Sequence, residues 1–238
     1  FALTAIGADL YAGGSFTSAG GVSANRIAKW DGTSWSALGS GINSTVNALT
    51  VMGGYLYVGG SFTTAGGTAA NNIAKWDGTS WSALGTGMNN RVNALAVMGT
   101  DLYAGGDFTT AGGTAANRIA KWDGTSWSTL SGDINATVVD LLVSGANLYV
   151  GGAFTIAGGT AANRIAKWDG TNWDNFCLGA NGVVNTVNAL AVIGTDLYVG
   201  GSFTIAGGVP ANRIAKWNGT SWSALGSGMS STVYALTA

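Results

Sequence analysis

One sequence unit of about 46 residues occurs five times in this chain of 238 residues. The motif K-W-[DN]-G-T-x-W fixes the register of the copies, which follow one another at 46 residues, except for the last at 49. Its first tryptophans are Trp30, Trp76, Trp122, Trp168 and Trp217. Repeats of this length form solenoids or propellers, in which each copy is one supersecondary unit. We therefore expect a single domain over residues 1–238, with repeats at about 1–46, 47–92, 93–138, 139–187 and 188–238.

Each copy contains four short runs of β-forming residues. In the second copy they lie at residues 46–51, 56–63, 72–76 and 81–84. Ala65-Gly66-Gly67 separates the second run from the third, and Asp77-Gly78, a strong hairpin signal, separates the third from the fourth. Four strands without an intervening helix exclude leucine-rich and ankyrin-type solenoids. The pattern predicts an all-β fold, a five-bladed β-propeller of four-stranded antiparallel blades.

Two features of the unit predict close packing. The Asp-Gly hairpin places Trp76 and Trp81 on adjacent strands, where an aromatic pair adds about 0.5–1.5 kcal/mol to stability. The pair Gly59-Gly60, at the end of the second run, is expected to let a neighbouring sheet approach closely.

Both ends of the sequence carry the same inner-strand segment, F-A-L-T-A at residues 1–5 and V-Y-A-L-T-A at residues 233–238. Five four-stranded blades that close into a ring leave one of these segments without a place. The spare strand would pair elsewhere, and oligomerisation through it is one expectation. A window cut from a longer array of six or seven blades is the alternative.

The unit resembles a kelch-type repeat, which has an apolar strand, a second strand ending in Gly-Gly, an aromatic residue, a turn and a Trp. The glycine doublets are Gly13-Gly14, Gly59-Gly60, Gly105-Gly106, Gly151-Gly152 and Gly200-Gly201. The closer similarity is to Gly- and Ser-rich variants, with L-Y-V-G-G-x-F-T and K-W-D-G-T-S-W, of bacterial secreted or surface proteins and fungal cortical polarity-marker proteins. The resemblance implies a propeller in an extracellular or cell-surface protein. It leaves the role open, because propellers host many unrelated functions.

The composition argues against several classes of function. Ten Lys and Arg residues balance eleven acids, so there is no basic excess for a nucleic acid. The absence of His excludes a Ser-His-Asp or Cys-His apparatus and imidazole metal ligands. No apolar run is long enough for membrane insertion. The Asp residues lie mostly at equivalent places in successive copies, such as Asp31, Asp77, Asp123 and Asp169 at the hairpin turn, which favours a structural role. The single Cys177 has no basic neighbour in sequence to activate it. We expect no enzyme, no cofactor and no metal site.

The repeated polar group that stands out is Asn-Arg-Ile-Ala-Lys, where the third strand begins. Its candidate ligand-binding residues are Asn25, Arg26, Asn71, Asn72, Asn117, Arg118, Asn163, Arg164, Asn212 and Arg213. One interpretation is structural: Asn closes the preceding loop with side-chain-to-backbone hydrogen bonds, and Arg and Lys face the acids of a neighbouring blade. The other is a set of five similar pockets between blades, each offering an amide, a guanidinium and a nearby aromatic ring to a sugar.

The expected function is a non-catalytic binding or display module of an extracellular or cell-surface protein, in contact with a glycan or protein partner. One alternative is a multivalent lectin with one sugar site per blade, whose avidity would come from multivalency. Another is a structural or assembly unit, such as a filament or a designed array. A lectin would use the repeated polar residues. A protein-binding module would use residues specific to one blade, such as Arg91, Asp107, Asp133, Asp140, Asp174 or the insert at residues 176–184.

Overall fold

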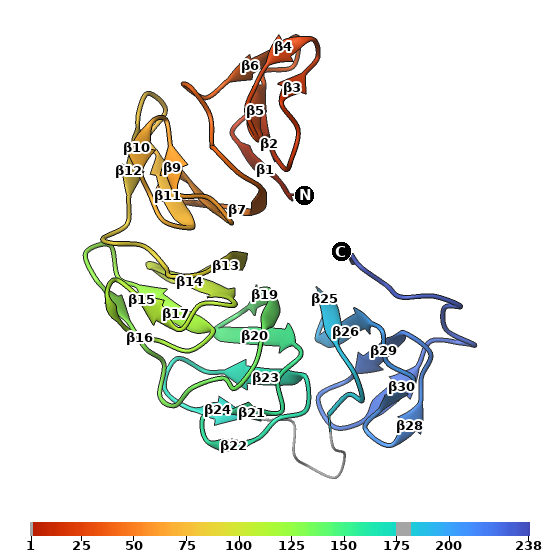
Figure 1. Ribbon diagram of the computed structural model, residues 1–238. Helices are drawn as coiled ribbons and strands as arrows, with labels where there is room; N and C mark the ends of the chain where they lie inside the picture. The colour runs from red at the N-terminus through yellow and green to blue at the C-terminus, as the bar shows by residue number, and fades with distance from the viewer. Residues whose placement is uncertain (1, 175–181) are drawn as a thin grey trace. The chain divides into compact units, whose positions relative to one another are not determined.

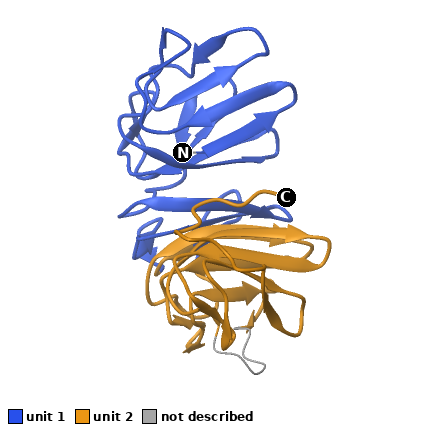
Figure 2. Cartoon of the chain, turned by 90° about the vertical axis from the view of Figure 1, so that its right-hand side faces the viewer, with its two compact units in different colours: residues 1–116, 120–128 blue, residues 117–119, 129–238 orange. Residues whose placement is uncertain are grey.

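The computed structural model describes residues 2–174 and 182–238, which form two compact units. Unit 1 comprises residues 1–116 and 120–128, and unit 2 comprises residues 117–119 and 129–238 (Figure 2). Cys177 and residues 176–181 of the insert lie outside the described residues. No helix in the described part of the chain is long and apolar enough to cross a membrane.

Unit 1 contains the first three blades (Figure 1). The first blade consists of β1 (Ala2–Ile6), β2 (Asp9–Gly13), β5 (Ile27–Trp30) and β6 (Trp35–Ala37). The second consists of β7 (Val46–Met52), β8 (Tyr55–Gly60), β11 (Ile73–Trp76) and β12 (Trp81–Ala83). The third consists of β13 (Val92–Met98), β14 (Asp101–Gly106), β17 (Ile119–Trp122) and β18 (Trp127–Ser128). Within β17, Ile119 is grouped with unit 2.

Unit 2 contains the last two blades. The fourth blade consists of β19 (Val138–Ser144), β20 (Asn147–Gly152), β23 (Ile165–Trp168) and β24 (Trp173–Asp174). The fifth consists of β25 (Val187–Ile193), β26 (Asp196–Gly201), β29 (Ile214–Trp217) and β30 (Trp222–Ala224).

The strands of each blade pair in the same order, as in β7-β8-β11-β12. Antiparallel register places Trp76 opposite both Trp81 and Leu56. The two indole rings lie 5.1 Å apart between centroids, and the equivalent pairs of the other blades lie at 5.2 to 5.5 Å. The predicted all-β fold of five four-stranded antiparallel blades, with its cross-strand tryptophan pairs, is confirmed.

The second strand of the blade is shorter than predicted. In the second blade it ends at Gly60, because the next N–H, that of Ser61, donates to the Thr45 carbonyl (2.9 Å) and the chain turns out of the sheet. A separate two-stranded hairpin follows, β9 (Thr64–Ala65) with β10 (Thr68–Ala69), and its turn is Gly66-Gly67. The sequence predicted only a turn here. The equivalent hairpins are β3 (Ser18–Ala19) with β4 (Val22–Ser23), β15 (Thr110–Ala111) with β16 (Thr114–Ala115), β21 (Ile156–Ala157) with β22 (Thr160–Ala161), and β27 (Ile205–Ala206) with β28 (Val209–Pro210).

Small residues let consecutive blades pack tightly. A Cβ atom placed on Gly59 would lie 2.6 Å from Cγ1 of Val92, on the inner strand of the following blade in unit 1. In unit 2, a Cβ on Gly151 would lie equally close to Cγ1 of Val187. Distances this short exclude any side chain, so the close approach predicted from the glycine doublet is confirmed.

Each unit buries apolar side chains between its own consecutive blades. In unit 1, one cluster joins the first and second blades and another joins the second and third, and they include the fully buried Phe62 and Phe108 respectively. In unit 2, Phe203 lies in the cluster that joins the fourth and fifth blades. Residues 233–238 continue this packing on the fifth blade, because the Val233 N–H donates to the Gly201 carbonyl (3.1 Å) and the Asn188 amide donates to the Val233 carbonyl (3.1 Å). The last segment thus takes an inner-strand position, and closure of a ring by either terminus stays a prediction.

Candidate functional site

Three of the predicted Asn-Arg or Asn-Asn pairs lie in similar grooves. The first groove, of about 390 Å³, is lined in unit 1 by Thr17, Asn25, Arg26, Ser40, Gly41, Ile42, Asn43, Thr64 and Gly67. The second, of about 290 Å³, is lined in unit 1 by Thr63, Asn71, Asn72, Thr86, Gly87, Met88, Asn89, Thr110 and Gly113. The third, of about 500 Å³, is lined in unit 2 by Asn117, Arg118, Gly132, Asp133, Ile134, Asn135, Ile156, Gly158 and Gly159. Equivalent segments of successive repeats therefore build one type of groove.

The residue after the repeated Asn has a left-handed backbone, which is uncommon outside glycine. Its φ lies between 63° and 69° in all five copies, at Arg26, Asn72, Arg118, Arg164 and Arg213. At Arg26 the backbone N–H donates to the Phe16 carbonyl and the Arg26 carbonyl accepts from the Gly14 N–H, both at 2.9 Å. These two bonds to the end of the second strand hold the residue in its strained conformation.

The arginine side chain strengthens the same connection. Nη1 of Arg26 donates to the Phe16 carbonyl (3.1 Å), and Arg164 and Arg213 do the same to Phe154 and Phe203 (3.0 Å each). Each guanidinium thus uses one of its five N–H donors to hold the backbone of its own repeat. The prediction that Arg faces acids of a neighbouring blade is wrong for these three copies.

The repeated Asn makes side-chain-to-backbone hydrogen bonds, as the structural interpretation predicted, but to the turn 15 residues later at the edge of the groove and not to the loop that precedes it. The Asn25 amide donates to the Ser40 carbonyl (3.2 Å), and the Asn25 carbonyl accepts from the Ile42 N–H (3.0 Å). Asn71 and Asn212 make the equivalent side-chain bonds to Thr86 and Ser227, at 3.1 and 3.0 Å. The Asn163 carbonyl accepts from the Val183 N–H at 3.0 Å.

In four of the five copies the repeated Lys pairs with an acid of its own blade, so the expected partner on a neighbouring blade was wrong. In the second copy Lys75 lies over the Tyr55 ring, 4.8 Å from its centroid. Lys29 lies 3.0 Å from Asp9, because β5 and β2 are paired and the two residues are diagonal neighbours on one face. Lys121 and Lys216 pair likewise with Asp101 and Asp196.

Sequence reasoning missed a second repeated amide on the wall of each groove. Oδ1 of Asn43 accepts from the backbone N–H groups of Thr63 (3.0 Å) and Thr64 (3.1 Å), while its Nδ2 donates to the Thr63 hydroxyl (2.8 Å). Asn89 and Asn135 make the same three bonds to residues 109–110 and 155–156. An Asn two residues after the G-x-G turn, or the related S-G-D turn, was the signal in the sequence that could have revealed this clamp.

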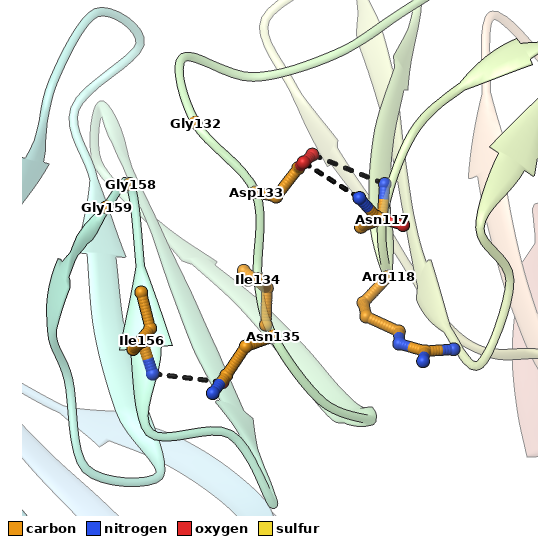
Figure 3. Close-up of a pocket in the computed structure, with 9 residues that line it drawn as sticks. All are labelled: Asn117, Arg118, Gly132, Asp133, Ile134, Asn135, Ile156, Gly158 and Gly159. Atoms are coloured by element: carbon orange, nitrogen blue, oxygen red, sulfur yellow. Dashed lines mark hydrogen bonds between the residues drawn. The ribbon is translucent and has the colours of Figure 1, made fainter.

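The third groove departs from the other two in charge and polarity. Asp133 replaces Gly41 and Gly87, and its carboxylate accepts from Nδ2 of Asn117 (2.8 Å) and from its backbone N–H (3.4 Å). Ile156 replaces a Thr and is 41% exposed. Figure 3 shows the Asp133 carboxylate turned toward Asn117, and the Arg118 side chain directed away from it.

The other charged residues that are specific to one blade also have partners, either in the same blade or on a strand of the next blade. Arg91 forms an ion pair with Asp107, and Lys167 pairs with Asp174 at 2.9 Å. Asp140, on β19, accepts from the N–H of Leu141 (2.9 Å) and from that of Leu190 on β25 (2.8 Å). Desolvation raises the pKa of Asp140 to about 6, against the lowering effect of its two backbone hydrogen bonds.

The Asp residues at the hairpin turns have the structural role that their recurrence predicted. Asp31 accepts four hydrogen bonds from the backbone and hydroxyl groups of Thr33 and Ser34. These bonds, with that from the Thr33 hydroxyl as the largest contribution, hold the pKa of Asp31 well below its usual range. In the fifth blade, Asn218 makes the same turn with Thr220 and Ser221.

The repeat and its four-stranded blades correspond to a known family. The family model described as the Rax2 C-terminal β-propeller domain matches residues 2–143 and, in a second overlapping match, residues 33–194. The chain belongs to this family. Membership agrees with the propeller fold that the sequence predicted. None of the curated proteins matches the chain.

Solved structures show the same type of fold at low sequence identity. The computationally designed Ika8 protein has a TM-score of 0.62 and 18% identity, over 99% of this chain and 64% of that one. U3-55K has a TM-score of 0.56 and 15% identity, over 91% and 60% of the two chains. The WD40 repeats of RRP9 give 0.56 and 14%, over 91% and 59%. The chain thus spans about three-fifths of the length of these three.

Proposed function

We propose that this propeller domain is a non-catalytic binding and display module of an extracellular or cell-surface protein. The third groove, as defined above, would take a basic side chain from a protein partner. The kelch-type and polarity-marker resemblance supports the cell-surface setting, and the Rax2 family membership is compatible with it. The observation that carries the proposal is that this groove has residues that differ from those at the equivalent positions of the first and second grooves.

In a repeat protein, the residues that stabilise the fold occur in each copy. A residue that differs from its equivalents at an exposed position therefore points to another role. Apart from Arg26 and the buried Ile42 and Met88, the first and second grooves are lined by Gly, Ser, Thr and Asn, whose side chains largely bond to the backbone. The third adds a carboxylate at Asp133 and an exposed apolar side chain at Ile156. A basic side chain matches both, because its alkyl stem can pack on Ile156 while its head pairs with Asp133.

The Asp133 carboxylate has the capacity for such a pairing. A carboxylate offers about four acceptor positions, and its bonds to Asn117 occupy two. A lectin with one site per blade has less support. The repeated Arg26, Arg164 and Arg213 side chains each hold a carbonyl of their own repeat.

The test is selection of displayed random peptides on the folded domain. The matched control is the double variant Asp133→Asn and Ile156→Thr, which removes the charge and restores the hydroxyl of the second groove. We expect enrichment of peptides with Lys or Arg, and loss of their binding to the double variant. Equal binding to both proteins, or enrichment without basic residues, would contradict the proposal.

A second candidate, an assembly role, rests on residues 233–238. Val233 is anchored on the fifth blade, yet residues 234–238 form no ladder with any strand in the described part of the chain, and Tyr234 is 79% exposed. An unpaired strand edge is a template for another strand. Sedimentation at increasing protein concentration tests this role, and a monomer at every concentration would contradict it.

A further inference from the structure

We infer that unit 2 contains a second site, separate from the third groove, which binds one neutral sugar residue. It is a cavity of about 130 Å³ between the fourth and fifth blades. The residues that carry the inference are Tyr149, Lys167, Asp174, Thr195, Leu197 and Trp217.

The site originates in a change of partner for the repeated Lys. In the first, third and fifth blades the Lys pairs with an Asp at the start of the second strand. In the fourth blade that position is Asn147, and the acid is instead Asp174 on β24, where the other four copies have Ser. Lys167 and Asp174 lie directly opposite each other in the antiparallel register, 2.9 Å apart. The fourth blade thus keeps the ion pair, but its acid lies on the strand at the other side of the lysine.

This change places three functional groups in one row on the face of the fourth blade. Tyr149 is opposite Lys167, and Lys167 is opposite Asp174, so all three side chains emerge on the same side of the sheet. The row of every other blade is Tyr, Lys and Ser, without an acid. Among the five described blades, only the fourth has its carboxylate directly opposite the ammonium on the outer strand; in the first, third and fifth the acid is at the start of the second strand.

The fifth blade supplies the opposite wall. Leu197 and Trp217 are register partners on β26 and β29, and both are buried, at 2% and 8% exposure. Tyr149 packs against the apolar cluster that contains them. Thr195, immediately before β26, adds a hydroxyl to the lining.

These groups match the chemistry of a sugar ring. Neighbouring hydroxyls of a ring can donate to the Asp174 carboxylate and accept from the Lys167 ammonium at the same time. The C–H face of the ring can pack against the half-buried Tyr149 ring and the edge of Trp217 that lines the cavity. The ion pair is accessible, because the Lys167 and Asp174 side chains are 27% and 56% exposed. A charged ligand fits less well, since it would leave one member of the pair without its partner.

The size of the cavity limits the ligand to one ring. A water molecule in the liquid occupies about 30 Å³, so the cavity of about 130 Å³ can seat one face of a single ring, with the rest of the ring outside it, and cannot hold an extended chain. The same chemistry is offered by a free monosaccharide and by a terminal residue of a glycan. The contacts of a single ring predict an affinity on the order of millimolar.

Saturation-transfer NMR with glucose, galactose, mannose and N-acetylglucosamine at millimolar concentrations tests the inference on the complete chain. We expect at least one of them to bind. The double variant Asn147→Asp and Asp174→Ser restores the arrangement of the first, third and fifth blades, so Lys167 keeps a partner. It should bind roughly tenfold more weakly, the loss expected for a charge-assisted hydrogen bond. The same comparison with oligosaccharides that end in the bound sugar distinguishes a glycan terminus from a free sugar.

Two further variants make the outcome unambiguous. Asp174→Asn replaces one carboxylate oxygen by an amide nitrogen, and it takes the place of the double variant if that variant does not fold. Asp133→Asn with Ile156→Thr, which alters only the third groove, should leave sugar binding unchanged, so the two proposals can fail separately. Absence of any signal with the folded wild-type chain, or equal binding by both Asp174 variants and the wild type, would overturn the inference.

Discussion

The indole Nε1 of Trp81 donates a hydrogen bond to the backbone carbonyl of Leu38, 3.0 Å away and 43 residues earlier in the chain. Trp127 makes the same bond to Leu84 at 2.9 Å. Leu38 follows the outer strand of one blade, and Trp81 opens the outer strand of the next. The repeated second tryptophan therefore joins the outer edges of consecutive blades in unit 1, in addition to its tilted contact with the first tryptophan of its own blade.

Trp81→Phe should destabilise the domain by about 0.5–1.5 kcal/mol, because it keeps a ring but removes one of the two hydrogen bonds to the Leu38 carbonyl, which still accepts from the Gly41 N–H (3.1 Å). Urea unfolding measures the change. Trp35→Phe is the matched control, since the Trp35 indole N–H has no such bond to a carbonyl among the described residues. Equal losses in the two variants would show that ring volume, and not the hydrogen bond, determines the effect.

Local signals explain why the blades could be predicted from the sequence. The Asp77-Gly78 turn and the tryptophans beside it specify a hairpin within a few residues. The same signal occurs in each of the five repeats. The hairpin β9–β10 escaped prediction because each of its strands has only two residues, too few for a periodic pattern.

The candidate site could be predicted only in part, because its geometry depends on contacts distant in the sequence. The Asn and Arg residues were found, but nothing local indicates a left-handed backbone at Arg26, which is fixed by Phe16 and Gly14. The acid partner of Lys29 was assigned to the wrong blade, because the repeat alone does not distinguish diagonal neighbours within a sheet from neighbours across two sheets.

Gly41→Ala should destabilise the domain strongly. Gly41 has a φ of 78°, and an added Cβ would lie 2.5 Å from the Asn25 carbonyl oxygen at the edge of the first groove. Gly7→Ala is the control, since Gly7 has a similar φ of 60° but open space around the added Cβ. We expect about 1–2 kcal/mol for Gly7→Ala, the cost of the left-handed backbone alone, and a clearly larger loss for Gly41→Ala. Thermal unfolding of both variants checks the order, and a reversed order would contradict it.

Asp77→Asn should leave the melting temperature at neutral pH nearly unchanged, whereas Asp77→Ala should lower it. The Asp77 carboxylate accepts from the Ser80 and Thr79 N–H groups (2.7 and 2.8 Å), and the fifth blade makes the same turn with Asn218. Only the Ala variant loses the acceptor. Calorimetry on the two variants decides, and equal melting temperatures for Asn and Ala would assign the turn to Gly78 instead.

Asp140→Asn should stabilise the domain at neutral pH but not in acid. The pKa of Asp140 is raised to about 6 in the folded chain, and a free carboxyl titrates near 3.9. The folded state therefore binds the proton more tightly, so the free energy of unfolding falls as the pH rises from about 4 to about 6 and then stays level. The Asn amide is neutral at every pH, and its single oxygen can still accept from the Leu190 N–H, which the carboxylate contacts at 2.8 Å. The bond from the Leu141 N–H to the other carboxylate oxygen (2.9 Å) is lost, at a cost of about 1 kcal/mol, which reduces the gain. We expect a gain of about 2 kcal/mol at pH 7 that disappears near pH 4. Urea unfolding of both proteins across this range measures it. If the difference in free energy of unfolding between the two proteins does not change with pH, Asp140 stays charged over the whole range. Desolvation of its carboxylate would then be too small to raise its pKa.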